Sequence, residues 1–284
     1  MPILEDEKCV EIFEDAKRDR EGFFAKQAEC LDWFTPWDRV LEWNPPYARW
    51  FSGGKLNACY NCLDRHMKTE TRHKTALIWE GERGEEVALT YEDLFYKVNI
   101  FANVLKSLNI QKGDKVAIYL PMIPEAVVAM LSCARIGAVH TVVFGGFSHD
   151  ALRDRIQDAG AKLVITADGG FRKGKNILLK ESVDLSVQEC PSVKNILVIK
   201  HTNCQVNMQE GRDHWLHQLM QDVPSECPAE EMDAEDELFI LYTSGTTGKP
   251  KGIVHTTGGY MLGATVTMRW VFDVKASDVY WCTA

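Results

Sequence analysis

Residues 113–148 read GDKVAIYLPMIPEAVVAMLSCARIGAVHTVVFGGFS, and this stretch decides the fold. Residues 116–120 form a short apolar run after a Gly-Asp turn and predict a buried strand. Residues 124–136 predict a helix that begins with proline and is closed by Gly137. Residues 139–144 predict a second strand. A strand, a helix and a strand joined by short turns form a parallel β-α-β unit, so we expect an α/β fold with parallel sheets flanked by helices.

The same alternation extends in both directions from this stretch. Upstream, Thr90 and Asp93 resemble a capping box, and apolar residues then recur at helical spacing as far as residue 108. Downstream, Ser148 is expected to cap a helix that runs to residue 159. We expect further strands at residues 163–166, 196–199 and 238–242, and a helix around Trp215.

Three segments do not follow the alternation. Residues 1–70 contain four tryptophans between turn-rich stretches, which predicts an irregular extension whose rings pack on the core; an aromatic ligand cage is the alternative. Residues 222–237 are acidic and predict a solvated loop. Residues 279–284 predict a strand, and because nothing follows to cover it, we expect the chain to be part of a longer protein.

Composition restricts the possible partners. The chain has 284 residues, 45% of them hydrophobic, and a formal charge of −9 without a basic cluster. Nucleic acid and membrane surfaces are therefore not expected as partners, because both select basic patches. Nine scattered cysteines and an acidic amino terminus predict free thiols in the cytoplasm. Cys59 and Cys62, with His66 nearby, could bind zinc, but no fourth ligand is evident and packed thiols are the expected reading.

The segment TSGTTGKPKG at residues 243–252 directly follows an apolar strand. Its three glycines expose backbone N–H groups, its four hydroxyls add donors, and its two lysines add positive charge. Such a loop suits the oxygens of a polyphosphate. It is not a Walker A loop, because only two residues separate Gly245 from Gly248 and proline follows Lys249. A flexible surface turn is the alternative.

A second basic turn lies at residues 168–175, which read DGGFRKGK. It follows an expected parallel strand, and ligands of open α/β sheets gather at the carboxyl ends of strands. An ordinary solvated loop explains the same residues equally well.

Residues 242–252 resemble the phosphate-loop signature of the adenylate-forming superfamily, which includes the acyl-CoA synthetases. The flanking segments at residues 61–66, 142–148, 255–260 and 278–284 are similar to the AMP-forming acetyl-CoA synthetase family. The resemblance covers residues 33–284, less than half of a full family member. It implies that residues 71–284 are the first part of the AMP-binding large domain, with the rest of that domain and a carboxy-terminal domain absent.

The resemblance implies a ligase that uses ATP, Mg²⁺, acetate and coenzyme A and forms an acetyl-adenylate. The β- and γ-phosphates would be held by the following residues: Thr243, Ser244, Gly245, Thr246, Thr247, Gly248, Lys249 and Lys251. The nucleotide end of coenzyme A would be bound by Arg172, Lys173, Gly174, Lys175, Phe144, Gly145, Gly146 and Ile177. Family members have arginine where this chain has Lys175, so the bidentate fork is lost there.

The resemblance also places the acyl pocket, the magnesium ligand and the lysine of the adenylation step beyond residue 284. No complete catalytic set is therefore expected, and we expect the 284-residue chain alone to show no acetate-dependent pyrophosphate exchange. A propionate or acetoacetate ligase and a non-catalytic nucleotide-binding module remain alternatives. We expect structural roles for His140, His149 and His255.

Overall fold

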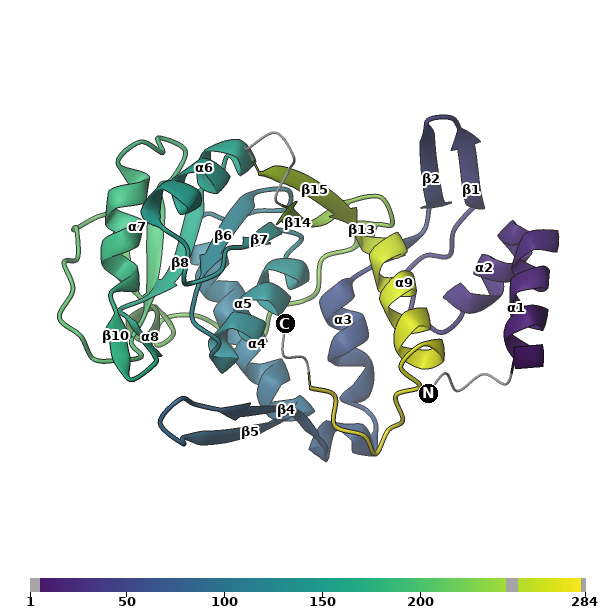
Figure 1. The fold of residues 1–284 in the computed structure, drawn as a ribbon, viewed down its shortest axis with the longest axis horizontal. Coiled ribbons are helices and arrows are strands. Elements are labelled where there is room, and N and C mark those ends of the chain that lie inside the picture. Colours follow the sequence, from purple (N-terminus) through teal and green to yellow (C-terminus); the bar gives the residue numbers. More distant parts are fainter. Residues whose placement is uncertain (1–5, 244–249, 282–284) are drawn as a thin grey trace. The chain divides into compact units, whose positions relative to one another are not determined.

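The structure, a computed structural model, describes residues 6–243 and 250–281. The chain divides into two compact units (Figure 1). Unit 1 comprises Met1–Leu56, Met232–Asp236 and Thr256–Ala284, and unit 2 comprises Asn57–Glu231 and Glu237–His255. Each unit is therefore built from segments that are distant in the sequence. The expected boundary at residue 70 stays a prediction.

A seven-stranded sheet forms the centre of unit 2, in the order β12-β11-β8-β6-β7-β14-β15. In chain order its strands are β6 (Lys115–Tyr119), β7 (Val139–Val142), β8 (Leu163–Ala167), β11 (Asn195–Ile199), β12 (Asp213–Trp215), β14 (Glu237–Thr243) and β15 (Lys251–Thr256). All five pairs of neighbouring strands in the run from β12 to β14 are parallel. The strands β6, β8 and β11 are almost entirely buried, which explains their continuous apolar runs.

Helices cover this sheet, and two short strands form a hairpin beside it (Figure 1). These elements are α3 (Ala58–Cys62), β4 (Thr75–Glu80), β5 (Glu86–Thr90), α4 (Tyr91–Ser107), α5 (Pro124–Arg135), α6 (His149–Ala159), α7 (Leu179–Val187) and α8 (Leu216–Leu219). Helix α4 packs on α5, and α6 packs on α7. The chain leaves β6 for β7 on one side and then crosses back to β8 on the other. The strand order therefore reverses between β6 and β8. Because crossovers between parallel strands are right-handed, two crossovers in opposite directions put α5 and α6 on opposite faces of the sheet.

Most elements expected from the sequence are confirmed, and so is the α/β fold class. The capping box at Thr90 and Asp93 is present in both directions, and Ser148 caps α6 by accepting from the N–H of Ala151. Gly137 follows α5 with a φ of 72°, a backbone conformation that glycine adopts without strain. Local capping chemistry therefore sets these helix ends.

Three expectations about local structure differ from the structure in whole or in part. Trp215 ends strand β12, and the helix begins only at the next residue, because β12 pairs with β11. Of the strand expected at residues 279–284, residues 279–281 form no strand, and residues 282–284 lie outside the described residues. Residues 222–237 are not simply a solvated loop, since Cys227 is 1% exposed. The buried amide of Asn103 donates to the carbonyls of Pro224 and Glu226, which holds that acidic segment against α4.

Unit 1 contains regular elements, and those within residues 1–70 lie where the sequence predicted irregular chain. They are α1 (Asp6–Arg18), α2 (Arg20–Ala28), β1 (Arg39–Asn44), β2 (Tyr47–Ser52), β3 (Lys55–Leu56), β13 (Met232–Asp233) and α9 (Thr257–Trp270). The rings of Trp33, Trp37 and Phe51 pack on one another with centroids 4.9–5.4 Å apart. These rings therefore bury one another inside unit 1. Among the described helices of the chain, none is long and apolar enough to cross a membrane.

Candidate nucleotide-binding site

The candidate site lies at the carboxyl ends of β6, β7 and β8, beside the point where the strand order reverses. Two glycines allow the segments that leave these strands to approach closely. A Cβ atom on Gly145 would lie 2.9 Å from the carbonyl oxygen of Leu120, and one on Gly170 would lie 3.1 Å from Cβ of Pro121. A side chain at Gly145 would clash with backbone and one at Gly170 would be crowded, so glycine lets the segments after β7 and β8 pack directly against the end of β6.

The basic turn predicted at residues 168–175 is a β-hairpin. Strand β9 (Gly170–Arg172) pairs antiparallel with β10 (Lys175–Ile177), and Arg172 lies opposite Lys175. Lys173 and Gly174 form the turn, with φ angles of 50° and 71°. Two left-handed residues are what a tight two-residue hairpin turn requires. The N–H of Gly174 donates to Oε1 of Glu82 at 2.7 Å, so the turn is also attached to the loop between β4 and β5.

The structure brings Arg172 together with the segment after β7. The guanidinium of Arg172 lies 5.3 Å from the ring centroid of Phe144, and a Cβ atom on Gly146 would lie 2.3 Å from Arg172 Nη1. The ring of Phe144 is 53% exposed and meets Phe147 edge-on. An exposed ring beside a guanidinium and bare backbone can accept a base or a phosphate.

The other residues expected at this site occupy two places. Lys173 and Lys175 are exposed on the turn and on β10, where their ammonium groups add to the charge of Arg172. Ile177 lies opposite Gly170 at the root of the hairpin and is half-buried. The sequence-predicted residues thus converge on one hairpin and one adjoining segment, with Ile177 at the hairpin's base.

Asp168 attaches this hairpin to the rest of the sheet, a role that the sequence analysis missed. Its buried Oδ1 accepts from the N–H groups of Gly169, His201 and Thr202 at 2.8–2.9 Å. Its Oδ2 has no hydrogen-bond partner within residues 6–243 and 250–281. The sequence does place an acidic residue directly after a buried strand. Loops that leave neighbouring strands have N–H groups there that need an acceptor, so this position could have indicated the role of Asp168.

Only the two ends of the expected phosphate loop can be placed. Thr243 ends β14 and Lys251 begins β15, and both are exposed. Between them, Ser244, Gly245, Thr246, Thr247, Gly248 and Lys249 lie outside the described residues. Because β14 is parallel to β7, Thr243 leaves the sheet at its carboxyl edge, as Phe144 does.

Two of the three histidines lie in one row of aromatic rings. His140 stacks on Phe239 at 5.6 Å, and Phe239 stacks on His255 at 4.4 Å. Burial lowers the pKa of His140 to about 4, so its ring is neutral at pH 7. His149 is exposed at the start of α6, 3.7 Å from Asp150. These surroundings favour structural roles.

Cys59 is buried beside an ion pair, and Cys62 nearby is partly buried. Arg135 binds Asp64 through two hydrogen bonds of 2.8 and 2.9 Å and lies 3.5 Å from Sγ of Cys59. Burial raises the pKa of Cys59 to about 12 and that of Cys62 to about 11, which keeps both thiols protonated. In the described part of the chain, no three His, Cys, Asp or Glu side chains form a cluster that could hold a metal ion.

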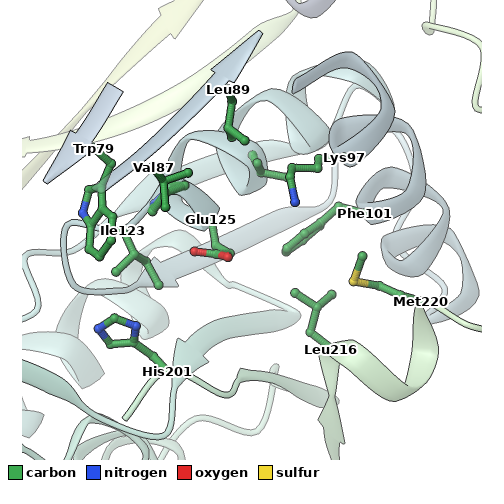
Figure 2. A pocket seen from close by; sticks show the side chains of 12 residues that line it. Trp79, Val87, Leu89, Lys97, Phe101, Ile123, Glu125, His201, Leu216 and Met220 are labelled. Carbon is green, nitrogen blue, oxygen red and sulfur yellow. The ribbon is translucent and has the colours of Figure 1, made fainter. Parts of the chain in front are cut away.

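A cavity of about 300 Å³ lies apart from these residues (Figure 2). Its walls are mainly apolar, and Lys97 and Glu125 supply opposite charges. It is lined by Trp79, Val87, Leu89, Lys97, Phe101, Ile123, Pro124, Glu125, Val128, His201, Leu216 and Met220. None of the sequence-predicted site residues that the structure describes lines it. His201 links it to the candidate site, because its backbone N–H binds Asp168 and its ring meets that of Phe171 in the hairpin.

Comparison with known proteins places the chain in a family. The model of the AMP-binding enzyme family matches residues 63–284, and that of the acetyl-coenzyme A synthetase amino terminus matches residues 10–62. The chain is 59% identical over 277 residues to the acetyl-coenzyme A synthetase of Gemmatimonas aurantiaca, covering 95% of this chain and 42% of that protein. It is 57% identical to that of Rubrobacter xylanophilus, covering 96% of this chain and 42% of that protein.

A solved structure agrees with these matches. Acetoacetyl-CoA synthetase from Streptomyces lividans superimposes with a TM-score of 0.81 at 28% identity, covering 90% of this chain and 39% of that one. The chain thus spans less than half the length of the relatives it matches. The resemblance indicated by the motifs is confirmed: this chain belongs to the AMP-binding enzyme family.

Proposed function

We propose that the complete protein carrying this sequence is an AMP-forming acetate–CoA ligase of the cytoplasm. It would convert ATP, acetate and coenzyme A into acetyl-CoA, AMP and diphosphate, and so form a carbon–sulfur bond. The observation that carries the proposal is identity of 50–59% to acetyl-coenzyme A synthetases over 95–99% of the chain. The substrates are small molecules, in keeping with the acidic charge of −9.

The first half-reaction would take place at the segment 243–252. An acetate oxygen attacks the α-phosphorus of ATP, taken as its Mg²⁺ complex, and the bond from that phosphorus to the β-phosphate oxygen breaks. Charge then builds up on the leaving diphosphate. Hydroxyls of Thr243, Ser244, Thr246 and Thr247, the bare N–H groups at the glycines and the ammonium of Lys249 would stabilise that charge, with Lys251 in support.

The second half-reaction would use the hairpin at residues 170–177. The thiol sulfur of coenzyme A attacks the acetyl carbonyl carbon and AMP leaves with the bonding electrons. The proximity of Arg172 to Phe144 and Gly146 supports binding of the nucleotide end of coenzyme A at this place. The ring would stack on adenine while the cations of the hairpin pair with phosphates.

Acetoacetate is the second candidate substrate, because the solved relative is named for it at 28% identity. Propionate remains a third. Turnover of acetate, propionate and acetoacetate by the complete protein, measured as CoA-dependent release of AMP, separates them. A larger kcat/KM for acetate supports the proposal, and a larger value for either other acid contradicts it.

The phosphate loop is tested by replacing one lysine inside it. Lys249→Met should lower acetate-dependent pyrophosphate exchange in the complete protein by about 100-fold, because a charge that stabilises the leaving group is lost. Lys194→Met is the control, since the ammonium of this exposed lysine bonds only to the carbonyl of Pro191 within the described structure. Equal activity of the two variants would contradict the assigned role. A wild-type protein without exchange would point to a non-catalytic nucleotide-binding module.

A further inference from the structure

The residue before the phosphate loop is attached to a distant helix. The hydroxyl of Tyr242 donates to Oδ2 of Asp158 at 2.6 Å, across 84 residues of sequence. Burial and then the carboxylate of Asp158 raise the pKa of this phenol above its usual value of 10. The hydroxyl therefore stays protonated and can donate at any physiological pH. Since Tyr242 immediately precedes Thr243, this bond holds the point where the loop begins.

A stacked guanidinium extends this attachment to the coenzyme A side. Arg155, only 9% exposed, lies 5.5 Å from the ring centroid of Tyr242 and 4.8 Å from that of Phe147. Its Nη1 donates to the carbonyl of Ala151 within α6, which fixes the plane of the group. Phe147 in turn meets Phe144, the ring beside Arg172. Contacts between rings and cations therefore run without interruption from the loop to the hairpin site.

The far end of the loop meets the same tyrosine. A Cβ atom on Gly252 would lie 3.2 Å from Cε1 and Cζ of Tyr242 and 3.0 Å from Cγ2 of Ile240. A bare glycine in β15 is thus what lets the ring of Tyr242 lie against that strand. Both ends of segment 243–252 are consequently fixed at one side chain.

We infer that Tyr242 is a positioning residue for the phosphate loop, held in place by Asp158 and Arg155 of α6. This inference rests on the proposed function of segment 243–252. Fixing this ring fixes the backbone at the two described ends of the segment, Thr243 and Lys251, so these two groups need less rearrangement when a polyphosphate binds. Helix α6 is also capped by Ser148, next to the coenzyme A segment, so one helix aligns the two substrate sites.

The hydrogen bond is tested by Tyr242→Phe in the complete protein. This variant keeps the ring against Arg155 and Gly252 but loses the donor to Asp158. We expect the KM for ATP in acetate-dependent pyrophosphate exchange to rise about tenfold, as for a lost bond to a charged acceptor. The KM for coenzyme A should not change. Asp158→Ala should have the same effect, and the double variant should be no worse than either single one.

The stacked guanidinium is tested by a matched pair of arginines on one helix. Arg155→Lys keeps the charge but loses the planar face, so the KM values for ATP and for coenzyme A should both rise about threefold. Arg153→Lys is the control, because Arg153 pairs with Asp150, Asp154 and Glu189 and contacts neither ring in the described structure. Gly252→Ala, which crowds the tyrosine ring, should raise the KM for ATP alone.

The outcomes separate this inference from the proposed function. An unchanged KM for ATP in Tyr242→Phe, with an active wild-type protein, overturns the inference alone. So does additivity in the double variant, or a loss of melting temperature and kcat with both KM values unchanged, which a purely structural role would give. A wild-type protein without acetate-dependent exchange overturns the proposed function first.

Discussion

Both units of the chain have apolar cores, but among the described residues buried ion pairs occur only in unit 2. In unit 2 the ammonium of Lys180 is fully buried and contacts Asp184 at 2.7 Å and Asp213 at 2.8 Å, and Arg135 is buried against Asp64. In unit 1 the buried cluster is apolar, with aromatic rings packed against it. Its members are Ala28, Leu31, Phe51, Leu56, Ala234 and Leu262.

This difference determines how each unit should respond to change. A buried ion pair costs much solvation energy, so removing one partner leaves an uncompensated charge. Unit 2 therefore depends on charge and pH. Burial alone would raise the pKa of Asp213, but hydrogen bonds from Arg212 and Lys180 outweigh it and lower that pKa. An apolar core responds instead to shape and volume. Unit 1 therefore depends on how its rings fit together.

The largest expected effect is that of Lys180→Met. It leaves the side chain of Asp213, which is fully buried, without its ammonium partner. The free energy of unfolding of unit 2 should fall by about 3–5 kcal/mol. Hydrogen exchange followed peptide by peptide measures this, and peptides of unit 1 should keep their protection. The control is Lys194→Met, an exposed lysine on the same unit; an equal loss there would remove the contrast between buried and exposed charge.

Acidification gives the second effect, through His140. Its folded-state pKa of about 4 lies below the ordinary 6.5, so the unfolded chain binds a proton that the folded chain does not. Stability from this group is present above pH 6.5 and is lost as the pH falls towards 4, by about 3 kcal/mol. Unfolding experiments from pH 7 to pH 4 on the wild type and on His140→Leu isolate the part of the pH dependence of the unfolding free energy that comes from His140. The same pH dependence in both proteins would contradict this role of His140. The control is His217→Leu at an exposed histidine, which should keep the pH dependence of the wild type.

A single methyl group tests the shape dependence of unit 1. In Gly54→Ala, the new Cβ would lie 2.7 Å from Cζ3 of Trp33 and 3.0 Å from the carbonyl oxygen of Phe51. We expect a loss of about 2 kcal/mol that does not vary with pH, because no charge is involved. Gly263→Ala in α9 is the matched control; it meets no atom within 4 Å and should stabilise the helix slightly. A neutral Gly54→Ala variant would mean that the rings are loosely packed.

The smallest expected effect concerns the charged hairpin. Lys175→Arg places a second guanidinium opposite Arg172 and restores a planar fork for phosphate. If the hairpin binds coenzyme A as proposed, the Kd for coenzyme A of the complete protein should fall about threefold. Calorimetric titration measures it, with Lys194→Arg as control. Weaker binding would show that the site depends on a compact ammonium at this position.

The alternating pattern of residues 90–199 was enough to predict most of unit 2. Capping residues such as Thr90 and Ser148 act on their own helix, so their effect is visible locally. The errors came where distant residues decide the outcome. Trp215 belongs to a strand because β11 lies beside it, and Cys227 is buried because its N–H binds the amide oxygen of Asn99.

The candidate site divides in the same way. Residue type and spacing alone predicted a basic turn around Arg172 and a phosphate loop at residues 243–252. The family resemblance implied that Phe144 and Arg172 bind the same nucleotide, but residue type and spacing did not indicate that the guanidinium lies over the ring, because the two belong to different crossovers. Asp168 was passed over for the same reason, since two of the N–H groups it binds come from the loop after β11.

By itself the sequence determined the α/β class, the family and the chemistry carried by each loop, because hydrophobic periodicity and glycine content act over a few residues. The tertiary structure alone decided which side chains share a neighbourhood. Tyr242 meets Asp158 across 84 residues because α6 and β14 pack in one unit. Contacts between such distant residues depend on how the crossovers fold back over the sheet, and no local sequence pattern encodes which residues they bring together.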